Sequence, residues 1–372
     1  MHFLIFISVF LSAQALFSYY IQKRLVNKLD LHSKYKKIFR YFLILNFFSI
    51  VFYMGARYYP MIPNWLYFIL SLSIGLTFVL FSLTFIYDLL SFALKKTPMQ
   101  TSRRNFFKKS LDVSTIVIGT TLTAKSMYNA KHYIVEEIDV KIKDLKKEYT
   151  IVQLSDVHIG GLIDQAFIKT LVKKVNSLNA DIVVITGDLV DTSLKYAQSS
   201  LDELQYLKSK YGVYFISGNH EFYHNIDAIL FSLENLGIKV LDNEHVYIGE
   251  KNQGFNLAGV HDVYGYKYGA YQPDIKKALQ GKKNSPTVLL AHQPRFIEEV
   301  PSSVDLVLSG HTHGGQIIPF NFLVSLVQPY VRGLHQHNLS TQIYVNKGTG
   351  FWGPPMRLGA SSEITHFHLK KA

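Results

Sequence analysis

The sequence contains no cysteine among its 372 residues. A chain without thiols forms no disulfide, has no thiolate nucleophile and builds no cysteine-ligated zinc site. Charged residues are also scarce, at 18% against 48% hydrophobic residues. This balance excludes a disordered chain and is unlike that of an ordinary, highly charged soluble enzyme. The length suits one domain with an appendage, or two domains.

Acidic residues are nearly missing from the first third of the chain. Residues 1–130 hold 15 Lys and Arg against three acids (Asp30, Asp88 and Asp112), whereas the remaining residues hold 24 of each sign. The whole net charge of +12 therefore lies in residues 1–130. A nucleic-acid enzyme is expected to have its positive patch on its catalytic part. Here the basic residues separate apolar runs, which is typical of membrane topology, so we expect no nucleic-acid partner.

The apolar runs in residues 1–130 predict an N-terminal transmembrane helical region. Helices are expected at about 2–22, 41–56 and 65–94, because each run reaches or approaches the roughly 20 apolar residues that a span needs. Buried helices of a soluble bundle are the alternative, but such helices would have a polar face. A further span at about 111–130 stays open. The predicted division is a membrane region over 1–130 and a catalytic domain over 131–372.

The basic stretches predict which side of the membrane the catalytic domain occupies. Loops 23–40 and 95–109 are expected to be cytoplasmic and the Arg57 loop to be outside. Residues 102–108 (SRRNFFK) resemble a twin-arginine export motif, and a moderately apolar run, 113–124, follows them. A juxtamembrane basic cluster before a short helix is the alternative. The pattern favours a multi-pass protein of the cell inner membrane with a periplasmic catalytic domain. If 111–130 does not cross, that domain is cytoplasmic.

From about Lys131 the sequence alternates between strand and helix signals, the pattern of an α/β domain. A short polar motif follows several of the predicted strands, at the edge where sheets of this class bind ligands. Helices are predicted at 164–178 and 226–236. Strands are predicted at 149–154, 181–186, 212–217, 255–260, 287–291, 304–309, 342–346 and 363–369.

Five motifs place carboxylates, an amide and imidazoles on these strand ends. Hard carboxylate oxygens mixed with imidazole nitrogens suit Mn²⁺, Fe or Zn²⁺. The set is too large for one tetrahedral ion, whereas two ions that share a carboxylate would use it all, as in sites that hydrolyse phosphate esters. Helix capping or turn formation explains each motif singly, but neither needs four spaced imidazoles. The motifs are Ser155–His158 (SDVH), Gly187–Asp191 (GDLVD), Gly218–Glu221 (GNHE), Ala291–His292 and Gly310–His313 (GHTH).

The ordered set resembles the calcineurin-like metallophosphoesterase superfamily over about residues 148–370. The similarity is greatest to a bacterial membrane-anchored or export-linked branch with GHTHGGQ, here Gly310–Gln316, and GPPxR, here Gly353–Arg357. This resemblance implies an α/β fold in which a β-sandwich is flanked by helices, and hydrolysis of phosphate bonds with two divalent metal ions. Glu221 stands where many members have aspartate.

The resemblance also implies roles for individual residues. In the family, His220 stabilises the transition state and assists the leaving group, and Asp191 orients it. Asp188 bridges the two ions. The first ion would be held by Asp156, His158, Asp188 and His313, and the second by Asp188, Asn219, His292 and His311.

Three further features are weaker candidates. His261 and Arg357 are each either substrate-binding or structural, and His366 and His368 on a terminal strand are expected to be non-catalytic. Residues 317–331 are richly apolar, and they are either core or a lip that enters a bilayer or holds an acyl chain.

The sequence as a whole predicts a membrane-anchored, binuclear-metal phosphoesterase. Its substrate would be a phosphate ester or anhydride, with a membrane lipid or lipid-linked phosphate favoured. The chain is also similar to the enzymes that cleave UDP-2,3-diacylglucosamine in lipid A synthesis, which would need a cytoplasmic site. A non-catalytic, ligand-sensing module would show lost ligands, and all the expected ligands are in the sequence. The oligomeric state stays open.

Overall fold

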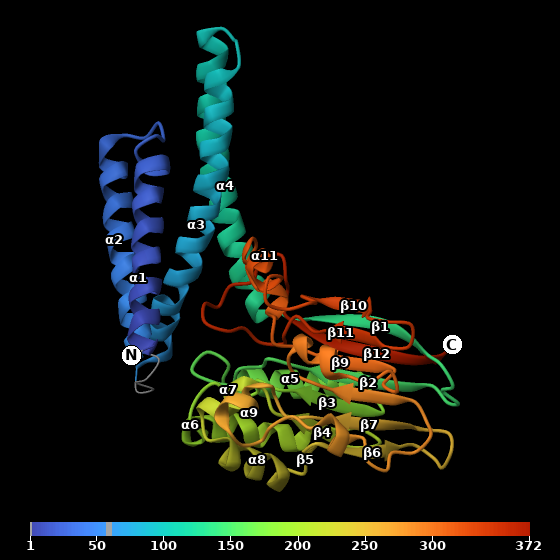
Figure 1. Ribbon diagram of the computed structural model, residues 1–372. Helices are drawn as coiled ribbons and strands as arrows, with labels where there is room; N and C mark the ends of the chain where they lie inside the picture. The colour runs from blue at the N-terminus through green and yellow to red at the C-terminus, as the bar shows by residue number, and fades with distance from the viewer. Residues whose placement is uncertain (1, 57–61) are drawn as a thin grey trace. The chain divides into compact units, whose positions relative to one another are not determined.

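The computed structural model describes residues 2–56 and 62–372 and separates the chain into two compact units (Figure 1). The Arg57 loop, which was expected outside the membrane, falls outside the described residues. The helical unit comprises Met1–Tyr128 and Gly353–Leu358, and the catalytic unit comprises Asn129–Trp352 and Gly359–Ala372. The sequence predicted a single boundary at residue 130. It did not predict that residues 353–358 belong to the helical unit.

The described residues of the helical unit form four long helices. Two of them, among the described residues, are long and apolar enough to cross a membrane: α2 has a mean hydropathy of 1.6 and α3 of 2.3. α2 begins at Ser33 rather than at 41, because the basic residues before Arg40 favour a helix. The helices are α1 (His2–Ile21, followed by a π turn at Gln22–Val26), α2 (Ser33–Ala56), α3 (Asn64–Lys96) and α4 (Thr101–Lys131).

The acids within these helices are paired. Asp88 in α3 accepts hydrogen bonds from Arg24 Nε (2.9 Å) and Lys28 Nζ (2.7 Å). Asp112 in α4 accepts from Tyr87 Oη (2.8 Å) and from Lys108. Ionisable groups inside a membrane bundle are expected to be paired in this way.

The loop at 353–358 packs onto the helices of its own unit. The Arg357 amide donates to the Ser126 carbonyl (2.7 Å), and the Arg357 side chain is fully buried. A Cβ at Gly75 in α3 would lie 2.5 Å from Met356 Sδ, so glycine is what allows the loop to approach this helix.

The catalytic unit is a sandwich of two six-stranded sheets with helices on its outside, which confirms the predicted fold class (Figure 1). One sheet has the order β1-β12-β2-β3-β4-β5 and the other β10-β11-β9-β8-β7-β6. In sequence order the strands are β1 (Ile134–Ile142), β2 (Tyr149–Leu154), β3 (Ile182–Thr186), β4 (Val213–Ile216), β5 (Lys239–Val240), β6 (Glu244–Ile248), β7 (Phe255–Gly259), β8 (Thr287–Leu290), β9 (Leu306–Ser309), β10 (Gly333–Gln336), β11 (Gln342–Val345) and β12 (Glu363–Lys371).

Three apolar layers hold the sandwich together. Strand residues such as Ile151, Phe255 and Phe367 fill the space between the sheets. The other face of the first sheet packs on the amphipathic helices, and the outer face of the second packs on short helices. The Asp164 side chain accepts from Phe167 N (3.0 Å) and fixes where α5 begins. The helices are α5 (Gln165–Ser177), α6 (Leu194–Leu201), α7 (Asn219–Tyr223), α8 (Ile226–Asn235), α9 (Tyr264–Tyr268), α10 (Ile275–Ala278) and α11 (Phe320–Val324).

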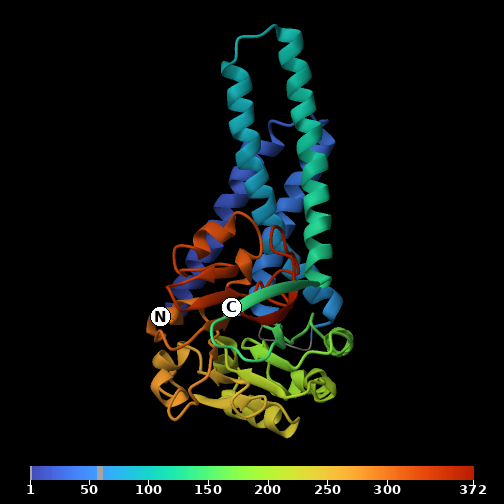
Figure 2. The ribbon, with the colours of Figure 1, turned by 90° about the vertical axis from the view of Figure 1, so that its right-hand side faces the viewer.

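The strand β12 lies between β1 and β2, parallel to β1 and antiparallel to β2. Figure 2 shows β12, in red, alongside β1, in green, at one side of the sandwich. Strands β2, β3 and β4 are mutually parallel, as are β7, β8 and β9. The carboxyl ends of parallel neighbours meet at one edge of a sheet, so the loops that follow these strands are brought together.

Candidate metal centre

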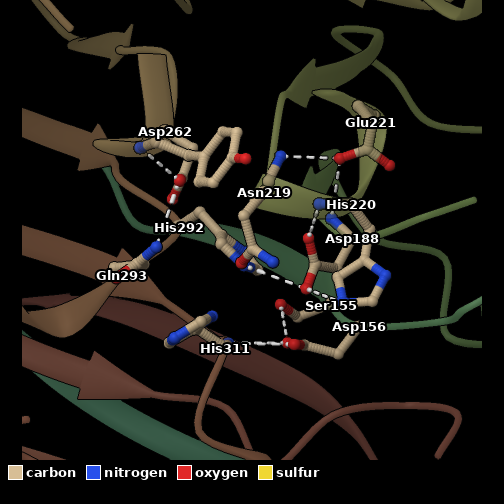
Figure 3. A network of polar contacts seen from close by, with 12 residues as sticks. Ser155, Asp156, Asp188, Asn219, His220, Glu221, Asp262, His292, Gln293 and His311 are labelled. Atoms are coloured by element: carbon tan, nitrogen blue, oxygen red, sulfur yellow. Dashed lines mark hydrogen bonds and ion pairs between the residues drawn. The ribbon is translucent and has the colours of Figure 1, made fainter. Parts of the chain in front are cut away.

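The seven predicted ligands gather at the carboxyl ends of five strands. Figure 3 labels five of them: Asp156, Asp188, Asn219, His292 and His311. All seven are buried except His311, which is partly exposed. Asp156 and His158 follow β2, Asp188 follows β3, Asn219 begins α7 after β4, His292 follows β8, and His311 and His313 follow β9.

The ligand atoms form two clusters. In the first, His313 Nε2 lies 3.5 Å from Asp156 Oδ1 and 3.0 Å from His158 Nε2. The second contains Asp188, His292 and His311, and within each cluster the donor atoms lie within 4.8 Å of one another. The composition of each cluster, carboxylate plus two imidazoles, suits a borderline divalent cation.

Asp188 lies between the two clusters. Its Oδ2 is 3.3 Å from His292 Nε2 and 3.9 Å from His158 Nε2, and its Oδ1 accepts a hydrogen bond from His220 N (2.8 Å). This is the position that a bridging carboxylate requires. The assignment of the individual ligands stays a prediction.

Three buried side-chain atoms of the predicted ligands have no hydrogen-bond partner in the described part of the chain: His158 Nδ1, Asn219 Oδ1 and His292 Nε2. The last two belong to residues predicted to bind the same ion. His292 donates through Nδ1 to the Thr186 carbonyl (2.7 Å), which turns Nε2 toward Asp188. A buried polar atom without a partner is costly, and a cation at this place would satisfy both atoms. The residues therefore fit a metal.

The electrostatics of the site also fit cation binding. Burial lowers the pKa of His158 and of His311 to about 3, so both imidazoles are neutral at pH 7, the form that binds metals. Burial raises the pKa of Asp156 to about 6. Burial opposes charge at His292 as well, but the adjacent Asp188 carboxylate raises the pKa of His292 well above its usual value. The buried carboxyl groups of Asp156 and Asp188 lie close together, and bound cations would balance their negative charge.

Five of the seven predicted ligands have a left-handed backbone, with φ between 50° and 68°. For residues other than glycine this conformation costs about 1 kcal/mol or more each, and it persists where function over-determines the structure. This backbone conformation lets nearby residues of one short loop, such as Asp156 and His158, both direct their side chains into the predicted metal centre. These residues are Asp156, His158, Asp188, His311 and His313.

Glu221 supports the Asp188 loop rather than joining the ligands. Its buried carboxylate accepts hydrogen bonds from the backbone amides of Gly218 (2.7 Å), Asp188 (3.1 Å), Leu189 (2.8 Å) and Val190 (3.1 Å). One side chain therefore ties the second motif to the third. The sequence singled out Glu221 only as a departure from the family pattern.

Two glycines make room for the ligands. A Cβ at Gly218 would lie 2.2 Å from Asp188 Oδ1, and a Cβ at Gly310 would lie 2.3 Å from Asp156 Oδ2. Real side chains do not approach so closely, so these two positions of the motifs require glycine.

His220 is buried beside the predicted ligands. Its Nδ1 is 2.7 Å from Asp191 Oδ1, and its Nε2 is 3.8 Å from Asp188 Oδ2. Asp191 can therefore accept the Nδ1 proton and leave Nε2 facing the ligands, which is the arrangement expected for this pair.

The structure separates the weaker candidates from this cluster. His261 is 1% exposed and both ring nitrogens are engaged, Nδ1 with Ser217 Oγ (2.9 Å) and Nε2 with Asp242 Oδ1 (2.8 Å). This geometry favours the structural alternative, since neither nitrogen is left for a substrate. Arg357 belongs to the helical unit.

The pair His366 and His368 lies on β12, where both rings contact Glu137 Oε2, at 2.9 and 2.8 Å. Glu137, His366 and His368 form a separate group of metal-binding side-chain types, to which the five motifs contribute no residue. Its place on the strand is in keeping with the expected non-catalytic role.

Asp262 is a buried carboxylate near His292 that the motifs do not include (Figure 3). Its Oδ1 accepts from Tyr264 N (2.7 Å) and Gln293 Nε2 (3.1 Å), and burial raises its pKa to about 6. The His-Asp pair after β7 was the only sequence signal for it.

The apolar segment, residues 317–331, is mostly on the surface of the catalytic unit rather than in its core. Ile317 is buried, but the segment includes α11 and exposes a run of large apolar side chains. The exposed ones are Ile318, Phe320, Phe322, Leu323, Leu326 and Val327.

Comparison with known proteins places this geometry among phosphoesterases. A family model described as calcineurin-like phosphoesterase matches residues 149–315. An uncharacterized metallophosphoesterase of Helicobacter pylori is 39% identical over 84% of this chain and 84% of its own length. One of Campylobacter jejuni is 37% identical over 100% and 99%. A transmembrane protein with metallophosphoesterase domain from Danio rerio is 31% identical over 83% and 75%.

Proposed function

Because the chain belongs to the calcineurin-like phosphoesterase family and is a metal-dependent phosphoester hydrolase, we propose that it works at a membrane on a lipid-linked phosphate ester or anhydride. The observation that supports this most directly is the exposed apolar segment, which begins four residues after the predicted ligand His313. Leu326 is 78% exposed, Val327 70% and Phe322 67%.

A contiguous exposed patch of this kind indicates contact with a membrane, a partner or a ligand. Phe and Leu side chains at a bilayer interface bury their apolar surface among acyl chains. The same polypeptide supplies α2 and α3, whose length and composition suit membrane spans. If α2 and α3 span a membrane, residues 317–331 always have a bilayer nearby to contact. In a lipid-linked substrate, these residues would bind the acyl chains.

The chemistry proposed at the site is hydrolysis at phosphorus. Two divalent cations, for which the donor set suits Mn²⁺, Fe or Zn²⁺, would supply charge stabilisation and activation of water. Asp156, His158, Asp188 and His313 would hold one, and Asp188, Asn219, His292 and His311 the other. Asp191 accepts a hydrogen bond from His220 Nδ1 and stabilises the protonated imidazolium, whose Nε2–H is placed to donate to the departing oxygen.

The placement proposed for the catalytic unit is periplasmic. Residues 111–130, which were left open as a span, form part of the single helix α4. At 1.5 Å per residue this 31-residue helix is about 46 Å long, more than the roughly 30 Å of a bilayer core. Its length suits a span, whereas among the described residues only α2 and α3 are also apolar enough. A cytoplasmic placement would instead suit the UDP-2,3-diacylglucosamine reaction.

The lipid-linked proposal is tested by comparing two substrates with the same phosphoanhydride. The detergent-purified full chain with Mn²⁺ is assayed for UMP release from UDP-2,3-diacylglucosamine and from UDP-N-acetylglucosamine, which has no long acyl chains. We expect a higher kcat/KM for the acylated substrate. We expect Phe322→Ser with Leu326→Ser to lose that preference and to keep activity on soluble p-nitrophenyl esters.

Leu339→Ser is the matched control, because Leu339 is fully exposed outside the apolar segment. Good hydrolysis of soluble diesters with no gain from acyl chains would replace the proposal with a general phosphodiesterase. A chain that binds two metals and hydrolyses none of these compounds would indicate a ligand-sensing module instead.

A further inference from the structure

We propose that Trp352 and Tyr223 form a subsite for an aromatic ring on the leaving group, and that Gln316 positions Trp352 within it. This inference rests on the proposed phosphoesterase function and adds a substrate class to it. The subsite lies beside His220, the residue expected to face the departing oxygen.

Two exposed aromatic rings flank the His220 ring. The Tyr223 ring centroid is 5.1 Å from that of His220, at an interplanar angle of 65°, and the Trp352 centroid is 6.1 Å away, at 76°. Tyr223 is 51% exposed and Trp352 44%. Aromatic surface is stabilised by burial, and about half of each of these two side chains is open to a ring that comes to lie beside His220.

Trp352 is held there by a side chain from the fifth motif. The Gln316 amide makes two reciprocal hydrogen bonds with the Trp352 backbone, Nε2 to O (2.9 Å) and Trp352 N to Oε1 (3.1 Å). Gln316 itself has φ of 47°, and it follows the predicted ligand His313 by three residues. The strained loop that presents a metal ligand therefore also fixes the tryptophan.

Tyr223 is fixed from the other side. It ends the short helix that begins with the predicted ligand Asn219, and its hydroxyl accepts a hydrogen bond from Asn219 Nδ2 (3.4 Å). Its ring meets Tyr264 edge-on, with centroids 5.1 Å apart. Tyr223 and Trp352 are thus both held by loops that carry predicted metal ligands. Because their positions are already fixed, binding of a ring would cost little additional side-chain entropy.

The class of leaving group follows from these walls. Rings prefer to meet other rings edge-to-face or offset at 4.5–7 Å, and such a pair is worth a few-fold in affinity beyond simple burial. An alkyl or small hydroxyl group would contact one wall at most. The geometry therefore favours a leaving group that carries an aromatic ring, whether that ring is joined to the ester oxygen directly or through a linker.

The kinetic test compares 2-naphthyl phosphate with phenyl phosphate, whose leaving groups have similar acidity and differ in ring area. We expect the wild type to prefer the naphthyl ester in kcat/KM. The preference should fall about two- to tenfold in Trp352→Ala and be largely kept in Trp352→Phe. Gln316→Ala should reproduce the loss with normal metal content. Trp65→Ala, at the other tryptophan of the chain, should leave the ratio unchanged.

A binding test separates this inference from the proposed function. In Trp65→Phe, Trp352 is the sole tryptophan, and saturable binding of phenylphosphonate should shift its emission to shorter wavelength. Methylphosphonate should not. If no ester is hydrolysed but the shift occurs, the phosphoesterase proposal fails and the subsite stands. An unchanged naphthyl preference in Trp352→Ala, or no shift with phenylphosphonate, overturns the subsite.

Discussion

Asp191 Oδ1 lies 2.7 Å from His220 Nδ1 and 3.6 Å from His224 Nε2, so one carboxylate oxygen faces two imidazoles. Only one of them, His220, also reaches toward Asp188. The difference between the two histidines can be measured, because each can be replaced while the carboxylate stays.

We expect His220→Asn to keep both metals and to slow turnover about 10²–10⁴-fold, the usual range for loss of a general acid or base. The loss should be smaller for p-nitrophenyl esters, whose leaving group needs little protonation. Steady-state rates across a series of leaving groups give the answer. His224→Asn is the control and should change turnover little. An equal loss for every leaving group would remove His220 from the leaving-group role.

Asp188→Asn should lose most bound metal and nearly all activity, since a neutral amide cannot balance two dications. Metal content by atomic emission is the direct measurement. Asp164→Asn serves as the control, because asparagine caps a helix as well as aspartate does and Asp164 caps α5. Two ions per chain with normal turnover in Asp188→Asn would rule out the bridging role.

Glu221→Gln should destabilise the catalytic unit and weaken metal binding together. The amide nitrogen of glutamine cannot accept hydrogen bonds, so two of the four backbone amides that face Glu221 lose their acceptor. Buried amides without partners cost about 1–3 kcal/mol each. Thermal unfolding with and without added Mn²⁺ measures both effects. The exposed Glu298→Gln should change neither. Wild-type stability and metal content in Glu221→Gln would show that the carboxylate does not hold the loop.

Gly218→Ala should abolish metal binding, because its methyl group would collide with Asp188 Oδ1 and the Asp188 backbone nitrogen. Gly160→Ala is a matched control in the same unit: its nearest neighbours would be 3.7 Å or more away. Metal content and circular dichroism are compared for both variants. Normal metal content in Gly218→Ala would show that the loop of Gly218 can move away from Asp188 without loss of the metal site.

The periplasmic placement predicts that added protease cleaves the catalytic unit in intact spheroplasts. Arg103→Lys with Arg104→Lys should then reduce the accessible fraction, if residues 102–108 direct export. A catalytic unit that becomes sensitive only after lysis would place it in the cytoplasm, and the UDP-2,3-diacylglucosamine reaction would then become the leading proposal.

The sequence was most informative where strands are buried on both faces. β2 and β3 were predicted within one residue of their ends, because continuous apolar runs bounded by polar motifs leave few alternatives. β1 was missed, since Glu137, Asp139 and Lys141 alternate along it. It pairs with β12 on one side only, so its outer face stays polar and its sequence lacks the apolar signal.

The sequence was sufficient to predict which residues belong to the site. It was not sufficient to predict the backbone conformations and hydrogen bonds that position them. No propensity argument predicts left-handed backbone at Asp156 or His311, because local sequence disfavours it and only the assembled site requires it. The four amides on Glu221 come from two loops and meet only after the strands pair. The return of residues 353–358 to the helical unit likewise depends on contacts distant in sequence.

The position of β12 between β1 and β2 constrains when the enzyme can become active. The first sheet lacks the strand between β1 and β2 until residues 363–371 have been synthesised. Until then β1 has no partner strand in this sheet, and β2 has one open edge. The metal-binding loops rest on that sheet. Biosynthesis therefore orders the events: helices α1 to α4 are synthesised before the catalytic unit, and hydrolytic competence comes only after β12 has been synthesised.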